Sequence, residues 1–420
     1  MCLAGTRERT LADIRRWSVD ESNAKQIYCL LDVAGSGKST VAKHVAEEWE
    51  RQGRLVARFF FSRDTAETMS TSSFCSTVAD TFATRDPNFK TLVDRFKQRP
   101  DLRLLSFEQL FSGLITEPLR ALNRPAILII DALDECNNEY GGRDELLNIL
   151  GNQRSSIPLL RMLATGRPER DIKDWAMRKS GVGYMDFMRL EGNSGDVQRY
   201  IKHRLQGLPN IQEHLYSVIR QAEGLFIWAR IACDLLLQTL DTNGLLERLG
   251  EEASLDYLYK LALKQSMPGD NVSHTAMITV LQMILAARVP LSIAQLDKLA
   301  PKQGIVEPVV TCLSSLLLCS SRRDPIRLLH ATLREFLTTQ SRAGDYYIQP
   351  RLGHYRLASG CIRIIGHQSK QDLSDLLYLD SLSAREDNRV PMRYLLTVYS
   401  VFLTIPQHHG YITVQCRAES

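Results

Sequence analysis

The residues with the clearest chemical potential lie between Gln26 and Thr40, where the sequence reads QIYCLLDVAGSGKST. A short apolar run is followed by a turn of small residues and then by Lys38 and Ser39. In a phosphate-binding loop such a turn wraps its backbone N–H groups round a β-phosphate, the lysine reaches the β/γ oxygens and the serine hydroxyl ligates Mg²⁺. The predicted nucleotide-binding residues of this loop are Ala34, Gly35, Ser36, Gly37, Lys38, Ser39 and Thr40.

A strand and a helix must hold this loop in place. The apolar run from Gln26 predicts a buried strand, and the apolar residues between Ser39 and Gln52 recur at helical spacing. Gly35 and Gly37 let the backbone approach an anion without a Cβ in the way, and the positive end of the helix points at the same place. Gly53 stands where a helix C-terminal cap is expected.

One position departs from the usual loop. The pattern GxxxxGK[ST] has glycine six residues before the lysine, and this chain has Asp32 there. A carboxylate close to a triphosphate would repel it by ~1 kcal/mol or more, depending on burial. The fold prediction is unaffected, but two alternatives stay open for binding: retained nucleotide affinity, or a loop that has lost it.

Three acidic residues follow a second apolar run. Ala126–Ile130 is fully apolar, as in a parallel strand covered on both faces, and Asp131, Asp134 and Glu135 come directly after it. Parallel sheets place their chemistry at the carboxyl ends of the strands. We therefore predict that Asp131 holds Mg²⁺ and that Asp134 or Glu135 polarises a hydrolytic water. The alternative is a solvated loop or helix cap.

A further strand is predicted over Leu159–Thr165, and Arg167 follows it. At that strand end Arg167 could sense a γ-phosphate, because Arg–phosphate hydrogen bonds are strong and directional. The alternative is a surface arginine before a helix that starts with proline. Leu55–Ser62 and Tyr184–Leu190 predict two more strands, so strands and helices alternate as in an α/β protein.

Composition limits the class of protein. The 420 residues are 44% hydrophobic and 24% charged, and 52 basic against 48 acidic residues give a net charge of +4 without a long basic run. We therefore predict no nucleic-acid partner. Nine scattered cysteines without a CxxC pair predict reduced thiols and no zinc site. The longest apolar stretch near the end, Tyr394–Ile405, is short of the ~20 residues of a membrane span, so we expect a cytoplasmic protein.

Five regions follow from these patterns. After Asn193 the strand signals stop and helical runs take over. Later, the runs Val280–Ala287, Ile293–Leu299 and Val306–Cys319 precede a short strand at Ile326–His330, an order that suggests a small winged helix. The predicted regions are 1–25 (lead-in helix with a GTR motif), 26–192 (P-loop NTPase domain), 193–270 (helical), 271–345 (winged-helix-like) and 346–420 (helical or poorly defined tail).

Taken together, the motifs resemble the NACHT domain of STAND-class P-loop NTPases, in particular the fungal NLR-like receptors and the related nephrocystin-3-like N-terminal module. The motifs that carry this resemblance are CLAGTR (2–7), VAGSGKST (33–40), FFFSR (59–63), LIIDALDEC (128–136), ATGRPE (164–169), EGLFIWA (223–229) and LLHATLREFL (328–337).

The resemblance implies a nucleotide-controlled signalling switch. The expected fold is a three-layer sandwich whose five-stranded parallel sheet has the order 5-1-4-3-2, followed by helical and winged-helix domains. Such proteins clasp ADP in a closed state; exchange for ATP opens the chain, which forms a homo-oligomer and activates an effector in innate immunity or self/non-self recognition. By position, Lys38 and Ser39 would hold phosphate and Mg²⁺, Asp131 the metal, Asp134 and Glu135 the water, and Arg167 would be the sensor.

His330 falls where such switches can place a histidine on the β-phosphate of ADP, although a core histidine explains it equally well. The family usually has glycine at Asp32 and serine at Gly166. Two hypotheses therefore stand: a slow ATPase switch with ATP/ADP and Mg²⁺, or a degenerate, non-catalytic scaffold. A metabolic kinase lacks any sign of an acceptor site, and the absence of an NKxD motif favours adenine over guanine. We expect a truncated receptor without a clear effector or repeat domain.

Overall fold

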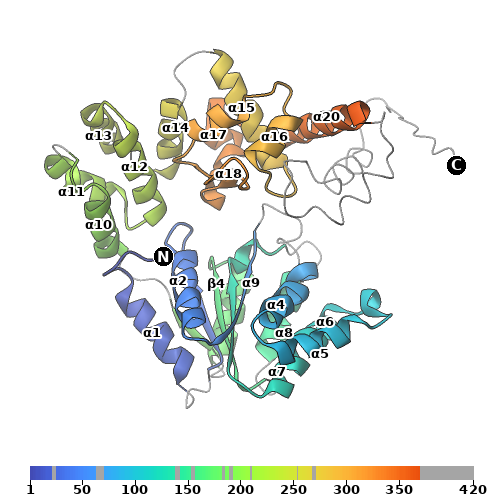
Figure 1. Cartoon of the computed structure of the whole chain (residues 1–420). Coiled ribbons are helices and arrows are strands. Elements are labelled where there is room, and N and C mark those ends of the chain that lie inside the picture. The colour runs from blue at the N-terminus through green and yellow to red at the C-terminus, as the bar shows by residue number, and fades with distance from the viewer. Residues whose placement is uncertain are drawn as a thin grey trace. The chain divides into compact units, whose positions relative to one another are not determined.

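The computed structural model describes the chain in ten stretches: residues 1–20, 25–62, 71–137, 142–152, 157–181, 185–188, 193–208, 211–252, 254–266 and 271–368. These divide into two compact units. Unit 1 contains Met1–Gln265 together with the short segment Leu329–Glu335, and unit 2 contains Ser266–Leu328 and the residues after Glu335. Figure 1 labels many of the elements of both units.

Unit 1 is built on a parallel sheet whose five strands lie in the order β2-β3-β4-β1-β5, or 5-1-4-3-2 from the other edge. The strands are β1 (Ile27–Leu31), β2 (Leu55–Phe60), β3 (Ala126–Asp131), β4 (Leu160–Gly166) and β5 (Met185–Met188). In register, Leu31 lies opposite Gly166 and Phe60 opposite Asp131. The carboxyl ends of β1, β3 and β4 therefore meet at one edge, where the predicted phosphate loop and acids begin. The ends expected for β5, Tyr184 and Leu190, lie outside the described residues.

Burial on both faces explains why β1 is apolar throughout. Successive side chains of a strand point to opposite faces. Tyr28 and Leu30 pack with α1 (Glu8–Val19) and α2 (Lys38–Arg51), whereas Cys29 packs on the opposite face with residues of the helices between β2 and β5. These helices are α4 (Phe74–Ala83), α5 (Pro87–Lys97), α6 (Phe107–Phe111), α7 (Glu117–Leu122), α8 (Gly142–Asn152) and α9 (Arg170–Gly181). The result is the helix–sheet–helix sandwich that the sequence predicted.

Two helical stretches of unit 1 contain irregular turns. A 3₁₀ turn at Thr71–Ser73 precedes α4. A π-helical turn, Ser112–Thr116, lies between α6 and α7. Arg63 of the FFFSR motif lies outside the described residues.

The helical region of unit 1 follows the sheet. Its helices are α10 (Asn193–Arg204), α11 (Ile211–Gln221), α12 (Phe226–Gln238), α13 (Thr242–Glu251) and α14 (Leu255–Ser266). The α12 helix carries the most buried residues of the five, among them Ile227 and Trp228. Its N-terminal end contacts the loop between β1 and α2, as Gly35 O accepts a hydrogen bond from Ile227 N–H at 3.2 Å.

Unit 2 contains helices and a small antiparallel ribbon. Its elements are α15 (Asn271–Ala286), α16 (Ile293–Leu299), α17 (Val306–Cys312), β6 (Leu317–Leu318), β7 (Arg327–Leu328), α19 (Gln340–Ala343) and α20 (Pro350–Gln368); α18 (Ala331–Leu337) lies mainly in the 329–335 segment of unit 1. Three helices followed by a β6–β7 ribbon is the order expected of a winged helix, which remains a prediction.

The apolar run Val306–Cys319 is helical only as far as Cys312. The chain turns at Leu313–Leu316, and Leu317 and Leu318 pair with β7 instead. The physical reason is the Ser-Ser pair before the leucines, because serine side chains compete for backbone groups and favour turns.

Most of the predicted 346–420 tail, including Tyr394–Ile405, lies outside the described residues; its first part forms α20. No helix within the described stretches is long and apolar enough to cross a membrane.

Candidate functional site

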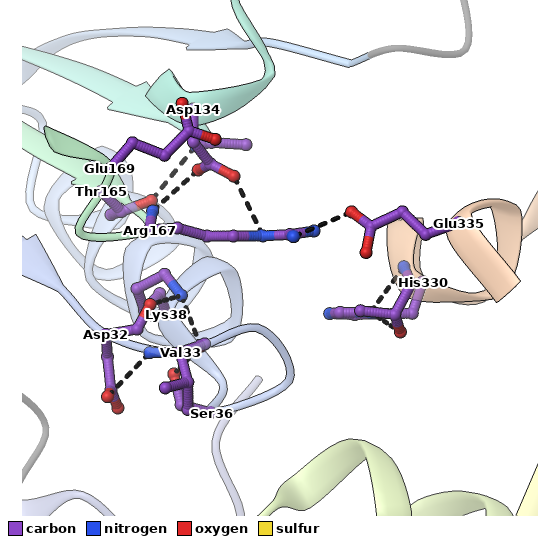
Figure 2. A network of polar contacts seen from close by, with 12 residues as sticks. Asp32, Val33, Ser36, Lys38, Asp134, Thr165, Arg167, Glu169, His330 and Glu335 are labelled. Carbon is purple, nitrogen blue, oxygen red and sulfur yellow. Dashed lines mark hydrogen bonds and ion pairs between the residues drawn. The ribbon is translucent and has the colours of Figure 1, made fainter. Parts of the chain in front are cut away.

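The loop between β1 and α2 is closed on itself by Lys38. Its ammonium donates to Asp32 O and Val33 O, both at 2.8 Å, and Ser36 Oγ donates to Val33 O at 2.9 Å. Gly35 and Gly37 have φ values of +78° and +96°, in the region that favours glycine. Burial lowers the pKa of Lys38, while the nearby charges of Asp134, Asp32 and Asp131 oppose that change. The Lys38 ammonium is thus already held by carbonyl oxygens of the loop, and phosphate oxygens can replace these as its hydrogen-bond acceptors (Figure 2).

Asp32, the departure from the usual loop pattern, caps the turn. Its Oδ1 accepts a hydrogen bond from Val33 N–H at 2.8 Å, which Figure 2 shows. Its Oδ2 is buried and makes no hydrogen bond within the described part of the chain. The side chain therefore stabilises the loop through one oxygen, while its other oxygen lies buried beside the predicted anion site.

Asp131 and Ser39, the predicted Mg²⁺ ligands, lie within hydrogen-bonding reach of each other, and their role on the metal remains a prediction. Asp131 is 7% exposed at the end of β3, and it accepts a hydrogen bond from Thr165 Oγ1. Burial raises its pKa, against the opposing influence of its hydrogen bonds with Thr165 and Ser39 and of the charge on Lys38. A carboxylate and a serine hydroxyl at a phosphate site are suitable ligands for Mg²⁺, which usually takes one or two protein oxygens together with phosphate and water. The donor set fits the ion.

Asp134 is tied to Arg167 rather than directed at solvent. Its Oδ1 accepts the Arg167 main-chain N–H at 2.9 Å, and its Oδ2 lies 3.1 Å from Arg167 Nε. Asp134 O also accepts a bond from Arg143 Nη1 at 3.1 Å. Glu135 is half-buried in the 3₁₀ turn Leu133–Glu135. The roles predicted for Asp134 and Glu135 on a hydrolytic water remain predictions; what the geometry gives Asp134 is the orientation of Arg167.

Arg167 extends from Asp134 to a residue far along the chain. Its Nη1 lies 2.8 Å from Glu335 Oε1, in the 329–335 segment of the same unit. Burial alone would lower the pKa of Arg167, but the carboxylates of Glu335 and Asp134 outweigh it and raise the pKa. Figure 2 shows the guanidinium between the two carboxylates. The predicted sensor thus already has an anionic partner.

His330 belongs to the same part of unit 1. Thr332 donates its N–H to His330 Nδ1 at 3.2 Å, and its hydroxyl lies 2.7 Å from Nδ1 and 2.8 Å from Tyr259 OH. Because Nδ1 accepts the Thr332 N–H, the ring proton of the neutral imidazole sits on Nε2. Burial, followed by the charges of Arg167 and Lys38, lowers the pKa of His330 to about 4. His330 is therefore a neutral ring electrostatically coupled to the loop lysine, and both of its predicted roles stay open.

Sequence reasoning missed three contacts round the loop. Arg7 Nη2 donates to Ser36 O, Phe226 stacks on the Arg7 guanidinium, and Ile227 fills the space where Gly35 would carry a Cβ, whose nearest atom would be 2.2 Å away. Glu335, the partner of Arg167, was missed as well. The motifs CLAGTR, EGLFIWA and LLHATLREFL contain all four residues, but motif membership gave no sign of which atoms they touch.

A family profile described as "Nephrocystin 3, N-terminal" matches residues 5–167, from the loop before α1 to the arginine after β4. That range includes the phosphate loop, the acids after β3 and Arg167, and it excludes the helical region and unit 2. A search of curated protein sequences gave no match.

A search of solved structures matched, among others, three archaeal proteins. They are the Walker-type ATPase PABY2304 of Pyrococcus abyssi (12% identity, TM-score 0.42, 78% of this chain and 94% of that one), Cdc6p from Pyrobaculum aerophilum (12%, 0.40, 85% and 94%) and the Orc1 protein of Aeropyrum pernix in complex with DNA (14%, 0.35, 77% and 90%). At these identities and TM-scores the similarity says nothing about ligand or partner. The P-loop NTPase fold of unit 1 stands on its own sheet, loop and acids.

Proposed function

We propose that this chain is an ATP/ADP-binding switch of the NACHT and STAND class, with slow hydrolysis that resets it. One observation carries the proposal. Arg167, at the strand end beside the phosphate loop, is ion-paired both to Asp134 and to Glu335. The residues on either side of the 329–335 segment belong to unit 2, so a change at Arg167 would reach unit 2 along the chain.

Binding would begin at the loop. Lys38 would leave the carbonyls of Asp32 and Val33 for the β/γ oxygens, and the N–H groups at the start of α2 would face the anion. Ser39 and Asp131 would hold Mg²⁺, which supplies charge neutralisation and polarisation of phosphate oxygens when bound. The Asp131 carboxylate, fixed by Thr165, would need no rearrangement to do so.

The switch would depend on a competition for Arg167. A γ-phosphate beside this guanidinium offers a stronger charge-assisted partner than the Glu335 carboxylate. ATP and ADP would therefore differ in how firmly the 329–335 segment is held, and a ligand can shift a conformational equilibrium only through such a difference. Homo-oligomerisation, an unidentified effector or sensor partner, a cytoplasmic setting and a role in innate immunity belong to the same proposal.

The second candidate is the degenerate scaffold, which specific observations favour. Asp32 leaves a buried oxygen beside the anion site that has no hydrogen-bond partner among the described residues. Gly166 could carry the serine usual in the family, because an added Cβ would meet its nearest neighbour, Asp134 Oδ1, at an ordinary 3.4 Å. Nothing steric therefore requires glycine there, which fits a site under relaxed functional demand.

Calorimetry with Mg-ADP and Mg-ATP tests nucleotide binding. We expect micromolar or tighter binding that Lys38→Ala abolishes. Lys43→Ala, an exposed lysine of α2 that pairs only weakly with Glu47 at 3.8 Å, is the matched control and should bind like the unaltered chain. Absence of binding by the unaltered chain would overturn the switch, and restoration by Asp32→Gly would establish the scaffold reading.

The ratio of ATP to ADP affinity tests the switch. Glu335→Gln removes the competitor for Arg167, so we expect ATP to bind about three- to tenfold more tightly relative to ADP, equivalent to ~1 kcal/mol. Asp174→Asn, which removes an exposed ion pair with Arg170, is the control. An unchanged ratio in Glu335→Gln would contradict the proposed competition.

A further inference from the structure

Two consecutive carbonyl groups of the phosphate loop are held from outside it. Gly35 O accepts the N–H of Ile227, at the start of α12, at 3.2 Å. Ser36 O accepts a hydrogen bond from Arg7 Nη2, which lies in the turn before α1. Ile227 and Arg7 therefore contact the loop from two segments that are distant from it in sequence.

Because the peptide bond is planar, fixing a carbonyl group also fixes the direction of the next N–H group. In a trans peptide the C=O of one residue points opposite to the N–H of the next. A fixed Gly35 O therefore directs the Ser36 N–H the other way, and a fixed Ser36 O does the same for the Gly37 N–H. Successive N–H groups turned to one side form the concavity that binds an anion. The positive φ values of Gly35 and Gly37 are part of this arrangement.

Arg7 is itself held firmly enough for this task. Its side chain is 4% exposed, its main-chain N–H donates to Asp196 Oδ2 at 3.0 Å, and its Nε lies 4.0 Å from the same oxygen. The guanidinium lies over the Phe226 ring, 5.1 Å from its centre. Phe226 in turn lies 3.7 Å from where Gly37 would carry a Cβ. The position of the guanidinium is thus set by its packing on Phe226 and by the charge of Asp196.

Burying an arginine is costly unless its charge is balanced and its donors are used. Here one donor is used on the backbone of the loop that receives phosphate. An arginine that served packing alone would need no hydrogen bond to that carbonyl, and a leucine or methionine would fill the space beside Phe226 at lower cost.

We propose that Arg7 is a positioning residue for the phosphate site: by holding Ser36 O it aims the Gly37 N–H at the diphosphate of a bound nucleotide. The inference rests on the proposed function, since it names how that same site recognises its ligand. It assigns Arg7 to the diphosphate group and not to the nucleoside.

The test compares Arg7→Gln, Arg7→Lys and the unaltered chain by calorimetry with Mg-ADP and with magnesium pyrophosphate. Arg7→Gln should weaken both ligands by the same factor, about tenfold, because the lost orientation concerns only phosphate. Arg7→Lys, which keeps a charged donor, should recover most of that loss. Arg15→Gln is the matched control. Arg15 lies on the same N-terminal segment as Arg7, but its ion pair is with Glu48 of α2, at 2.7 Å, and not with the phosphate loop.

Each outcome has one meaning. Equal affinities in Arg7→Gln and the unaltered chain would overturn the Arg7 assignment and leave the proposed function standing. Loss of ADP affinity with unchanged pyrophosphate affinity would overturn it too, because Arg7 would then act on the nucleoside. If the unaltered chain bound neither ligand, the proposed function itself would fail. Should Arg7→Gln not fold, Arg7→Lys decides alone. A small and equal weakening of both ligands, the part of the loss that lysine does not recover, supports the assignment, whereas unchanged affinity for both ligands or weakening of ADP only contradicts it.

Discussion

At the scale of single residues, the Asp134–Arg167 pair is the most consequential contact of the site. Asp134 is 3% exposed; its Oδ1 accepts the Arg167 main-chain N–H, and its Oδ2 forms an ion pair with Arg167 Nε at 3.1 Å. Removing one partner of a buried ion pair strands the other without compensation. The same pair connects the residues that follow β3 and β4 and orients Arg167, so it contributes both to stability and to the proposed function.

We predict that Arg167→Ala lowers the free energy of unfolding of unit 1 by about 2–3 kcal/mol, less than for a fully buried pair because Arg167 keeps 24% exposure. Asp134→Asn should cost less, since the amide oxygen still accepts the Arg167 N–H. Glu335→Gln, whose carboxylate is 33% exposed, should cost about 0–1 kcal/mol. Urea unfolding measures all three, and equal losses for Arg167→Ala and Glu335→Gln would contradict the ranking.

His330 predicts a dependence of stability on pH. Its pKa falls from 6.5 to about 4 in the folded chain, so the unfolded chain binds the proton more readily between those values. The stability from the neutral ring is complete above pH 6.5 and is lost as the pH falls towards 4. We expect a loss of about 2–2.5 kcal/mol between pH 7 and pH 4.5, visible as a lower Tm.

His330→Gln is the control for this pH effect. It has no ring to protonate, so the Tm difference between the two chains should narrow as the pH falls. Parallel pH profiles of the two chains would show that other groups, and not His330, cause the loss.

At the scale of elements, the π-helical turn between α6 and α7 lies where a side chain of α5 packs directly against its backbone. Gly113 lies in that turn, and a Cβ there would lie 1.9 Å from Phe96 Cε2. Helical turns widened in this way interrupt the regular hydrogen-bond pattern, so they usually have a local cause. The approach of Phe96 to the backbone of Gly113 is that cause here.

Gly113→Ala should therefore lower the free energy of unfolding by about 1–3 kcal/mol through overpacking, although alanine is the better helix former. Gly195→Ala in α10, where no atom lies within 4 Å of the added Cβ, should be neutral or stabilising. Combining Gly113→Ala with Phe96→Leu should recover part of the loss, because leucine lacks the atoms that clash. Chemical unfolding of the single and double variants would reveal whether the two changes are coupled, and additive losses would contradict the packing explanation.

At the scale of the whole molecule, the division into two units predicts that ADP, which lacks the γ-phosphate proposed to act through Arg167, stabilises unit 1 alone. Anything that binds only the folded state of one unit stabilises that unit by mass action. The phosphate loop, Arg167 and His330 all belong to unit 1. In unit 2, Gly353 of α20 packs so closely on α15 that a Cβ would lie 2.1 Å from Gln282 O.

We predict two calorimetric unfolding transitions. ADP at a hundred times its Kd should stabilise unit 1 by about 2.7 kcal/mol and leave unit 2 unchanged. Gly353→Ala should lower only the transition that ADP does not move, whereas Lys38→Ala should remove the ADP effect. A single transition that responds to both changes would show that the units unfold together.

Local patterns in the sequence determined much of unit 1. The apolar runs of β1 and β3 record burial on both faces, and an acid or a lysine directly after such a run must lie at the carboxyl edge of the sheet. This prediction depends only on residues that are neighbours in the sequence. The phosphate loop and the acids after β3 therefore lie at the edge of the sheet where we expected them. The helix end at Cys312 and the π-helical turn at Gly113 could not be predicted in this way, because both depend on what packs nearby.

Contacts between distant residues were decided only by tertiary structure. The sequence marked Asp134 as an acid and Arg167 as a sensor, but it could not show that each is the other's partner. Nor could it bring Arg7 to Ser36 or Glu335 to Arg167, because hydrogen bonds across such separations are fixed by how the elements pack and not by any periodicity. Composition and spacing determine which face of a helix or strand is buried. Only the tertiary structure determines which side chains of other elements pack against that face.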